Sequence, residues 1–112
     1  MLSKELVAAS TKPLLLSLLG EGESYGYELI RRVKELSGDE LQWTEGMLYP
    51  VLHRLESEGL IEAEWRAAEN GRQRKYYRLQ QSGHTALQRE QAQWLTVHAT
   101  LNKLWKLNPS ST

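Results

Sequence analysis

Residues 46–60 of this chain read GMLYPVLHRLESEGL, a pattern of apolar and polar residues that is typical of a helix apart from one proline. On a helical wheel its apolar residues gather on one side, which predicts an amphipathic helix with a core-facing stripe of Leu48, Val51, Leu52 and Leu55. Thr44 is a suitable N-cap, and Gly59 suits the left-handed position that ends a helix. Pro50 is unexpected, because a proline inside a helix costs about 3 kcal/mol.

The opposite side of this predicted helix carries few charges. Its residues are Gly46, Tyr49, Pro50, His53, Arg54 and Ser57. If the helix effectively begins near Gly46 or Met47, Pro50 falls in the first turn, where its missing N–H has no intrahelical partner to lose. Glycine and proline on an exposed face also let a partner molecule approach closely. We therefore interpret this side as a contact surface.

Two helices are predicted before this stretch. The first runs from about Lys4 to Leu19, and Pro13 inside it implies a break, a kink or a restart. The second runs from Tyr25 to Leu36, with Ser24 as its N-cap. The ELQW stretch, residues 40–43, is consistent with a short extended piece.

A β-hairpin and a long helix are predicted after it. Residues 60–66 alternate, with Ile61, Ala63 and Trp65 on one side, as in a half-buried strand. Asn70-Gly71 is a turn signal, and residues 74–79 form the returning strand. A helix then extends from about Gly83 to Leu107. The fold class is mainly α with a small β-hairpin.

Charge is distributed unevenly along this chain of 112 residues, whose formal net charge is zero. Residues 1–64 hold six Lys and Arg against twelve Asp and Glu, and residues 65–112 hold eight against two. This split favours a localised basic surface for an anionic partner, although a solvated basic hairpin would give the same pattern. No apolar run is long enough to span a bilayer, the start lacks a secretory pattern, and cysteine is absent, so we expect a cytoplasmic protein.

The order of elements has the plan of a helix-turn-helix followed by a basic hairpin. In that motif the exposed face of the second helix enters the DNA major groove. The hairpin, whose tip and return strand hold Arg72, Arg74, Lys75 and Arg78, can reach phosphates or the neighbouring minor groove. Tyr49 can offer its hydroxyl to a phosphate and its ring to a thymine methyl group.

Several segments resemble the PadR family of transcriptional regulators over about residues 14–87. They are YGYELI, GMLYPVLHRLESEGLIEAEW and NGRQRKYYRLQQSG, in the family's order and spacing. The resemblance implies a winged helix-turn-helix, and a homodimer that binds inverted repeats in promoters, which we interpret as a repressor. One residue departs from the family, because Met47 stands where a small hydroxyl residue is frequent. A hydrogen bond at the helix start could thereby be lost and the base preference changed.

The resemblance also assigns candidate contact residues. For the recognition helix, together with its exposed face, the candidates are Thr44, Gly46, Met47, Tyr49, Pro50, His53 and Arg54. For the wing they are Asn70, Gly71, Arg72, Arg74 and Lys75. Tyr25 and Tyr27 are expected at the phosphate-facing start of the second helix. The partner is double-stranded DNA, and no cofactor is expected.

The last helix carries an apolar stripe that one small domain can hardly cover. Its members, with the flanking residues, are Leu87, Trp94, Val97, Leu101, Leu104 and Trp105. Exposed tryptophans favour aggregation, so we expect two copies to bury this stripe against each other. We favour a plain interface core, and the alternative is a planar aromatic effector held between Trp94 and Trp105. The expected division is a DNA-binding domain at 1–81, a dimerisation helix at 82–108 and a disordered tail at 109–112.

The sequence gives less support to other classes of function. No nucleophile, base and orienting group occur together in the pattern that catalysis requires, so we expect no enzyme. His53, His84 and His98 lack the spacing of metal ligands. The alternative that remains is a winged-helix protein-interaction module whose basic hairpin binds an acidic partner.

Overall fold

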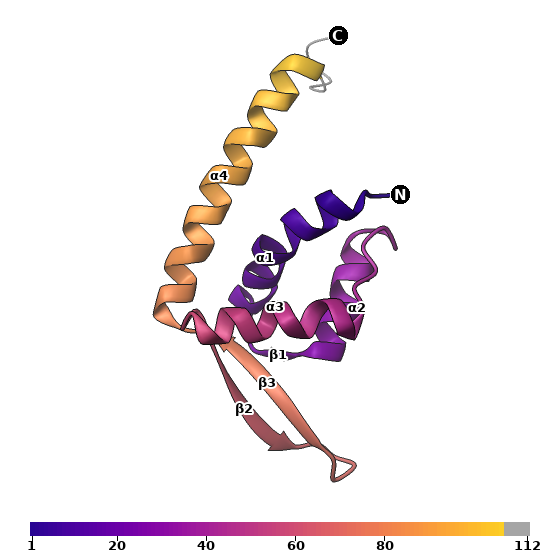
Figure 1. Ribbon diagram of the computed structural model, residues 1–112, viewed down its shortest axis with the longest axis vertical. Coiled ribbons are helices and arrows are strands. Elements are labelled where there is room, and N and C mark those ends of the chain that lie inside the picture. The colour runs from indigo at the N-terminus through magenta and orange to yellow at the C-terminus, as the bar shows by residue number, and fades with distance from the viewer. Residues whose placement is uncertain (107–112) are drawn as a thin grey trace.

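A computed structural model describes residues 1–106 and contains four helices and three strands. They follow the order α1 (Lys4–Gly20), β1 (Ser24–Tyr25), α2 (Gly26–Leu36), α3 (Glu45–Ser57), β2 (Ile61–Ala67), β3 (Gln73–Leu79) and α4 (Gln81–Trp105). Figure 1 shows α1, α2 and α3 forming the body, the β2–β3 hairpin extending from one end, and α4 leaving in the opposite direction. The molecule therefore measures 56 × 29 × 24 Å.

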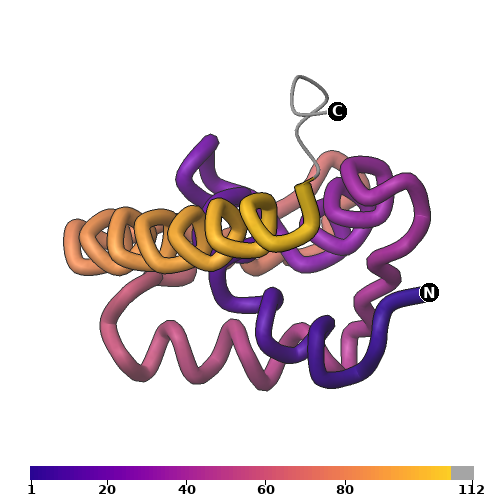
Figure 2. Tube along the Cα trace, turned by 90° about the horizontal axis from the view of Figure 1, so that it is seen from above, coloured from indigo at the N-terminus to yellow at the C-terminus, as the bar shows by residue number. Residues whose placement is uncertain are grey.

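The core lies among the three helices of the body. It is built mainly from leucines that α1, α2 and α3 turn inward, and Leu15, Leu16, Leu29, Leu48 and Leu52 are completely buried. The stripe predicted for α3 is confirmed, since Leu48, Leu52 and Leu55 are buried and Val51 is half-buried. The view from above shows α4 crossing over this body (Figure 2), and Ala86 and Leu87 near its start pack against the core.

The segment between α2 and α3 differs from the prediction. Residues 40–43 form no strand, yet Leu41 and Trp43 are buried in the core. The Leu41 N–H donates to Ser37 Oγ at 2.8 Å, which holds the chain close to the end of α2. Two apolar anchors thus hold this segment against the core, and hydrogen bonds that include the one to Ser37 hold it to the end of α2.

The sheet has a short first strand that was not predicted. Ser24 and Tyr25 form β1, which pairs antiparallel with Tyr77 and Tyr76 of β3, so the sheet has the order β1-β3-β2. The prediction of Ser24 as the N-cap of α2 is wrong. Its hydroxyl donates to Glu28 Oε1 at 2.5 Å, and Tyr25 occupies the cap position with an extended backbone.

Both internal prolines lie within continuous helices. Helix α1 runs uninterrupted over Lys4–Gly20 with Pro13 inside it, so the chain neither breaks nor restarts there. Pro13 removes the hydrogen bond to the carbonyl of Ala9, four residues earlier, and Ala9 is exposed. Water can therefore hydrate that carbonyl, which reduces the cost of the proline.

The last helix starts two residues earlier than predicted, with Gln80 at the cap position. Ser82 Oγ donates to the Gly59 carbonyl at 2.7 Å and the Gln80 N–H donates to the Leu60 carbonyl at 2.9 Å, which fasten α4 to the base of the hairpin. Its helical part ends at Trp105, and Lys106 is left-handed. The predicted end at Leu107 and the predicted tail at 109–112 lie outside the described residues.

Candidate nucleic-acid interface

The start of α3 is set by its cap. Thr44 Oγ1 accepts a hydrogen bond from the Met47 N–H at 3.2 Å, as the prediction of Thr44 as N-cap requires. This capping hydrogen bond uses the backbone N–H of Met47 and therefore does not depend on the side chain at position 47. The Met47 side chain is half-buried against the core instead of standing free on the contact face.

Pro50 lies deeper in α3 than we predicted. Because the helix begins at Glu45, Pro50 is beyond the first turn, and the interpretation that the helix starts at Gly46 or Met47 is wrong. Pro50 leaves the Gly46 carbonyl without its helical donor. Both residues are exposed, so solvent or a partner molecule can reach that carbonyl.

The exposed side of α3 is otherwise as the wheel predicted. Pro50, His53 and Arg54 are exposed, and an added Cβ at Gly46 would have no heavy atom within 4 Å. This face is free of neighbouring elements and is therefore accessible to a large partner.

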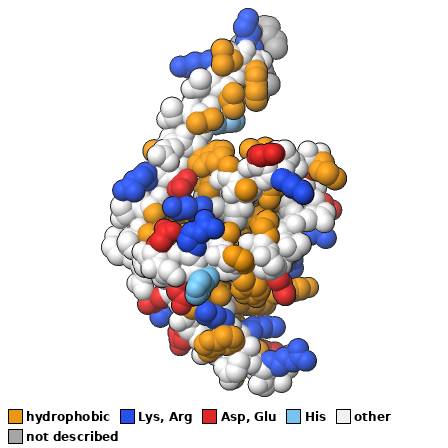
Figure 3. Space-filling model, viewed as in Figure 1, with side chains coloured by type: hydrophobic (Ala, Val, Ile, Leu, Met, Phe, Trp, Pro, Cys, Tyr) orange, Lys and Arg blue, Asp and Glu red, His pale blue; other side chains and the backbone are white. Residues whose placement is uncertain are grey.

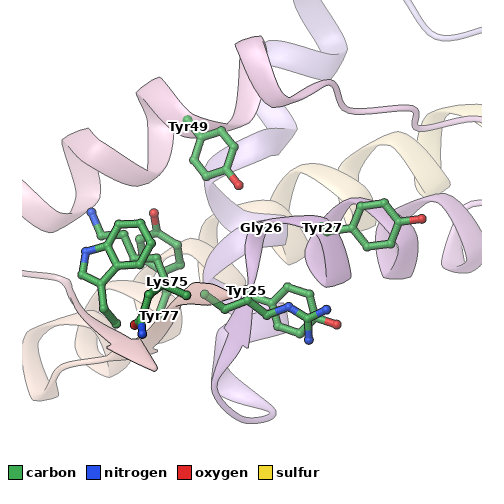
Figure 4. Close-up of a pocket in the computed structure, with 9 residues that line it drawn as sticks. Tyr25, Gly26, Tyr27, Tyr49, Lys75 and Tyr77 are labelled. Atoms are coloured by element: carbon green, nitrogen blue, oxygen red, sulfur yellow. The ribbon is translucent and has the colours of Figure 1, made fainter. Parts of the chain in front are cut away.

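Tyr49 leans back toward α2 instead of projecting straight outward. An added Cβ on Gly26 would lie 2.5 Å from the Tyr49 hydroxyl oxygen and 2.9 Å from Cζ, so the phenol rests on the first residue of α2 (Figure 4). The side chain nevertheless remains 42% exposed. Burial, and next the charge of Glu45, raise the pKa of Tyr49, so its hydroxyl stays a hydrogen-bond donor at neutral pH.

The first turn of α2 and Tyr49 of α3 line the same groove. The Tyr25 side chain makes no capping hydrogen bond there. Helix N-termini carry partial positive charge and donate backbone N–H groups to anions. Tyr27, in this turn, is 66% exposed.

The hairpin presents two chemically different faces, which separate residues that the prediction had grouped. Register pairs Trp65 with Lys75 and Arg66 with Arg74, so Arg74 and Lys75 lie on opposite faces of the sheet. The Arg74 guanidinium stacks over the Tyr25 ring at 4.3 Å. The Lys75 ammonium is 3.4 Å from Glu56 Oε1 of α3.

The hairpin loop spans residues 68–72. Gly71 has φ of +83°, which suits glycine, and Asn70 Oδ1 accepts a hydrogen bond from the Arg72 N–H at 3.0 Å. This loop is longer than the two-residue turn that Asn-Gly commonly forms. It carries Arg72 at the tip of the wing.

Arg66 and Arg78 are already paired within the sheet. Arg66 donates to both oxygens of Glu23 at 2.5 and 2.8 Å, and Arg78 donates to Glu64 at 3.0 Å and to Glu62. The Arg66 guanidinium lowers the pKa of Glu23, and Arg78 followed by Arg66 lowers that of Glu64. Among the described residues Arg72 and Arg74 have no carboxylate within 4.0 Å, so they are the wing cations most available to an anion.

A groove of about 480 Å³ lies between α3, the start of α2 and the hairpin. It brings together five predicted contact residues, Tyr25, Tyr27, Tyr49, Arg74 and Lys75. Figure 4 shows Tyr49 entering it from α3 while Lys75 and Tyr77 enter from the hairpin. The other DNA-contact candidates lie outside it: Gly46, Pro50, His53 and Arg54 are on the outer face of α3, Asn70, Gly71 and Arg72 are in the wing loop, Thr44 caps α3, and Met47 packs against the core.

Four lining residues were not predicted as site residues, namely Gly26, Trp65, Gln73 and Tyr77. The alternation of β2 suggested that Trp65 shares the buried side with Ile61, but Trp65 is 63% exposed and Ile61 is 2% exposed. The same face of the strand leaves the body and enters the wing, where no core covers it. Tyr77 is buried, and burial, followed by the nearby Tyr49 and Glu56, raises its pKa to about 12.

In the described part of the chain, nowhere do three or more His, Asp or Glu side chains gather as they would to hold a metal ion. Along residues 1–106 no helix combines the length and apolarity needed to cross a bilayer.

A helix-turn-helix pair followed by a basic hairpin defines a winged-helix DNA-binding protein. Residues 15–89 match the model of the transcriptional regulator PadR-like family, and the chain belongs to that family. It is 36% identical over 84 residues to the transcriptional regulator Rv3488 of Mycobacterium tuberculosis, covering 75% of each protein.

Solved structures agree with this assignment. A transcriptional regulator from Clostridium thermocellum superposes with a TM-score of 0.82 at 28% identity, covering 92% of this chain and 97% of the other. A PadR family regulator from Eggerthella lenta gives a TM-score of 0.74 at 36% identity, with coverage of 93% and 88%. The winged-helix fold predicted from the sequence is thus confirmed, and the protein is a DNA-binding transcriptional regulator.

Proposed function

We propose that this regulator is a homodimeric repressor that binds an inverted-repeat operator in duplex DNA. The observation that carries the proposal is the groove in which Tyr49 of α3, the first turn of α2 and the cations of β3 converge. Aromatic hydroxyls, a helix N-terminus and cations on one surface suit the phosphates of a DNA strand. A dimer covering a promoter would exclude other proteins from the same DNA.

The candidate residues divide into three roles under this proposal. Gly46, Pro50, His53 and Arg54 face the bases of the major groove. The wing loop with Asn70, Gly71 and Arg72 reaches the adjacent backbone or minor groove, and the groove residues hold phosphates. Thr44 and Met47 act indirectly, because their hydrogen bond fixes the first turn of α3.

The dimer is proposed from the exposed apolar surface of α4. Val97 is 51% exposed, Leu104 71% and Trp105 61%, and Leu101 is half-buried. Figure 3 shows hydrophobic side chains along the projecting helix and in the hollow beside it. A groove of about 380 Å³ between α1 and α4 continues this surface, with Trp94 as one wall. Monomeric proteins rarely expose so much contiguous apolar area, and two-fold dimers are the commonest assemblies.

Binding of a planar aromatic effector is a second candidate role for this interface. A hollow of about 500 Å³ is lined by Pro13, Leu87, Trp94 and Leu95, among others. Trp94 Nε1 donates to Glu90 Oε2 at 3.2 Å, which fixes the indole as one flat wall. Titration of planar aromatic dyes, followed by tryptophan fluorescence and by DNA affinity, tests this role. Dye binding that leaves DNA affinity unchanged would argue against an effector.

Selection from random duplex DNA tests the central proposal. Wild type would be compared with a variant in which Arg72, Arg74 and Lys75 are all alanine. In a control variant Lys4, Lys12 and Lys103 are all alanine, which removes the same amount of positive charge from α1 and from the far part of α4. We expect wild type and the control to enrich an inverted repeat and the wing variant to lose it. Failure of wild type to enrich any sequence would favour the alternative, a module that binds an acidic protein.

A further inference from the structure

Trp65 is a large apolar side chain that the fold leaves uncovered. It lies on β2 opposite Lys75, on the face of the hairpin that turns toward α3, and is 63% exposed. The Lys75 ammonium lies 6.0 Å from the centre of its ring, within the range of a cation–π contact. Trp65 is not one of the buried core residues, so the exposed face of its indole is available to a partner.

The position of Trp65 between α3 and the wing indicates which part of DNA it would meet. In a winged-helix complex α3 occupies the major groove and the hairpin reaches toward the neighbouring minor groove. The sugar-phosphate strand that separates these two grooves must then pass between α3 and the hairpin. The groove of about 480 Å³ that Trp65 lines lies between those two elements.

The lining of this groove fits a sugar-phosphate better than a base. Lys75, Arg74 and the first turn of α2 supply the positive groups that a phosphate requires. Trp65 adds a flat, uncharged surface beside them, which suits the apolar face of a deoxyribose. Base edges lie inside the grooves, where α3 and the wing tip reach, and not along the strand between them.

We propose that Trp65 packs its indole face against a deoxyribose of the DNA strand that runs between α3 and the wing. In the complex Lys75 leaves Glu56 for the phosphate next to that sugar. The inference rests on the proposed DNA-binding function. Because deoxyribose is the same in every nucleotide and indole is uncharged, Trp65 raises affinity for any duplex without reading sequence and without changing the salt dependence.

Binding measurements test these properties. Fluorescence anisotropy over a range of salt would compare Trp65→Ala, Trp65→Phe and Lys75→Ala on the selected operator and on a scrambled duplex. We expect Trp65→Ala to weaken both duplexes by the same factor, on the order of tenfold, at an unchanged salt slope, and Trp65→Phe to recover much of the loss. Lys75→Ala should lower the log–log slope by about 1. Leu36→Ala is the matched control, because Leu36 is 73% exposed at the end of α2, and it should change nothing.

Two results would overturn the inference. One is a much larger loss on the operator than on the scrambled duplex, which would make Trp65 a base contact. The other is wild-type affinity in Trp65→Ala. Circular dichroism melting of each variant shows whether the fold is intact, and Trp65→Phe keeps the test valid if the alanine variant unfolds.

Fluorine NMR separates failure of the inference from failure of the proposed function. The protein would be labelled with 5-fluorotryptophan, and the Trp65 resonance identified by its absence from Trp65→Phe. On adding duplex DNA we expect this resonance to shift and to lose its H₂O/D₂O solvent-isotope effect. If wild type binds no duplex, the proposed function fails and the inference fails with it. If wild type binds DNA while the Trp65 resonance keeps its solvent exposure, the inference alone fails.

Discussion

Gly83→Ala should destabilise the protein, although replacement of glycine by alanine inside a helix is ordinarily stabilising. A Cβ at Gly83 would lie 2.1 Å from the Leu60 carbonyl oxygen and 3.1 Å from Leu79 Cδ2. Leu60 cannot easily retreat, because its carbonyl accepts the Gln80 N–H at 2.9 Å. Since relaxed carbon–oxygen contacts are about 3.3 Å or longer, α4 and the β2 side of the hairpin would have to separate by roughly 1 Å.

The expected cost follows from two opposing effects. Overpacking at a rigid site costs about 3 kcal/mol, and alanine regains up to about 1 kcal/mol over glycine in a helix. The net loss is therefore about 2 kcal/mol. For a chain of 112 residues, each kcal/mol shifts Tm by about 4 °C, so Gly83→Ala should lower Tm by about 8 °C.

Gly46→Ala is the matched control. Gly46 also lies in the first turn of a helix, and nothing approaches the space that its Cβ would take within 4 Å. Thermal unfolding by circular dichroism would be measured at one protein concentration, because the Tm of a dimer depends on concentration. We expect Gly46→Ala to match or exceed the wild-type Tm. Equal Tm values for the two variants would refute the contact between Gly83 and Leu60 as the reason for this glycine.

Three further outcomes are expected. Glu56→Gln should tighten binding to any duplex because it frees Lys75 from its ion pair. The expected gain is a few-fold in Kd, roughly the contribution of one exposed ion pair. Fluorescence anisotropy at low salt measures this Kd, and an unchanged value would contradict the prediction. Trp94→Asp should give monomers by light scattering, whereas Leu36→Asp, away from α4, should leave a dimer; a dimer in both variants would exclude this interface. Tyr77 has its pKa raised to about 12 by burial, so the folded state favours the neutral phenol and loses stability as pH rises from about 10 through that pKa. Urea unfolding should show a smaller alkaline loss for Tyr77→Phe, and parallel losses would show that another group is responsible.

The helices of the body could be predicted because their signals are local. Apolar spacing and the Thr44 cap place α3 correctly within one or two residues. The cap itself shows why the interpretation of Pro50 was wrong, since Thr44 fixes the start at Glu45 and a late start was assumed only to accommodate the proline. Strand β1 has no local signal, because two residues cannot show a period and their pairing with β3 depends on residues about fifty positions away.

The candidate site could be predicted only in part, for a similar reason. The residues on the exposed face of α3 were predicted correctly from its periodicity. The groove depends on how the hairpin turns relative to α3, which alternation alone does not fix. Alternation assigned Trp65 to the same face as Ile61, which is correct, but it cannot tell where along the strand the core ends.

The uneven charge of the sequence has a different meaning in the folded protein. Glu23, Glu62 and Glu64 come from the acidic part of the chain, and they pair across the sheet with Arg66 and Arg78 from the basic part. Two of the eight Lys and Arg residues in the basic part of the chain are therefore already paired with these carboxylates before DNA binds.

Few wing cations remain for phosphates after this pairing. Arg72 and Arg74 are available directly, and Lys75 becomes available only when it leaves Glu56. At about 0.9 in the log–log salt slope for each phosphate neutralised, the wing of one subunit can contribute at most about 2.7. A wing with so little charge needs uncharged contacts to bind well, and the aromatic lining of the groove, with Trp65 exposed in it, can provide them. The salt bridges on one face of the hairpin thus make the aromatic side chains on the other face more important for affinity.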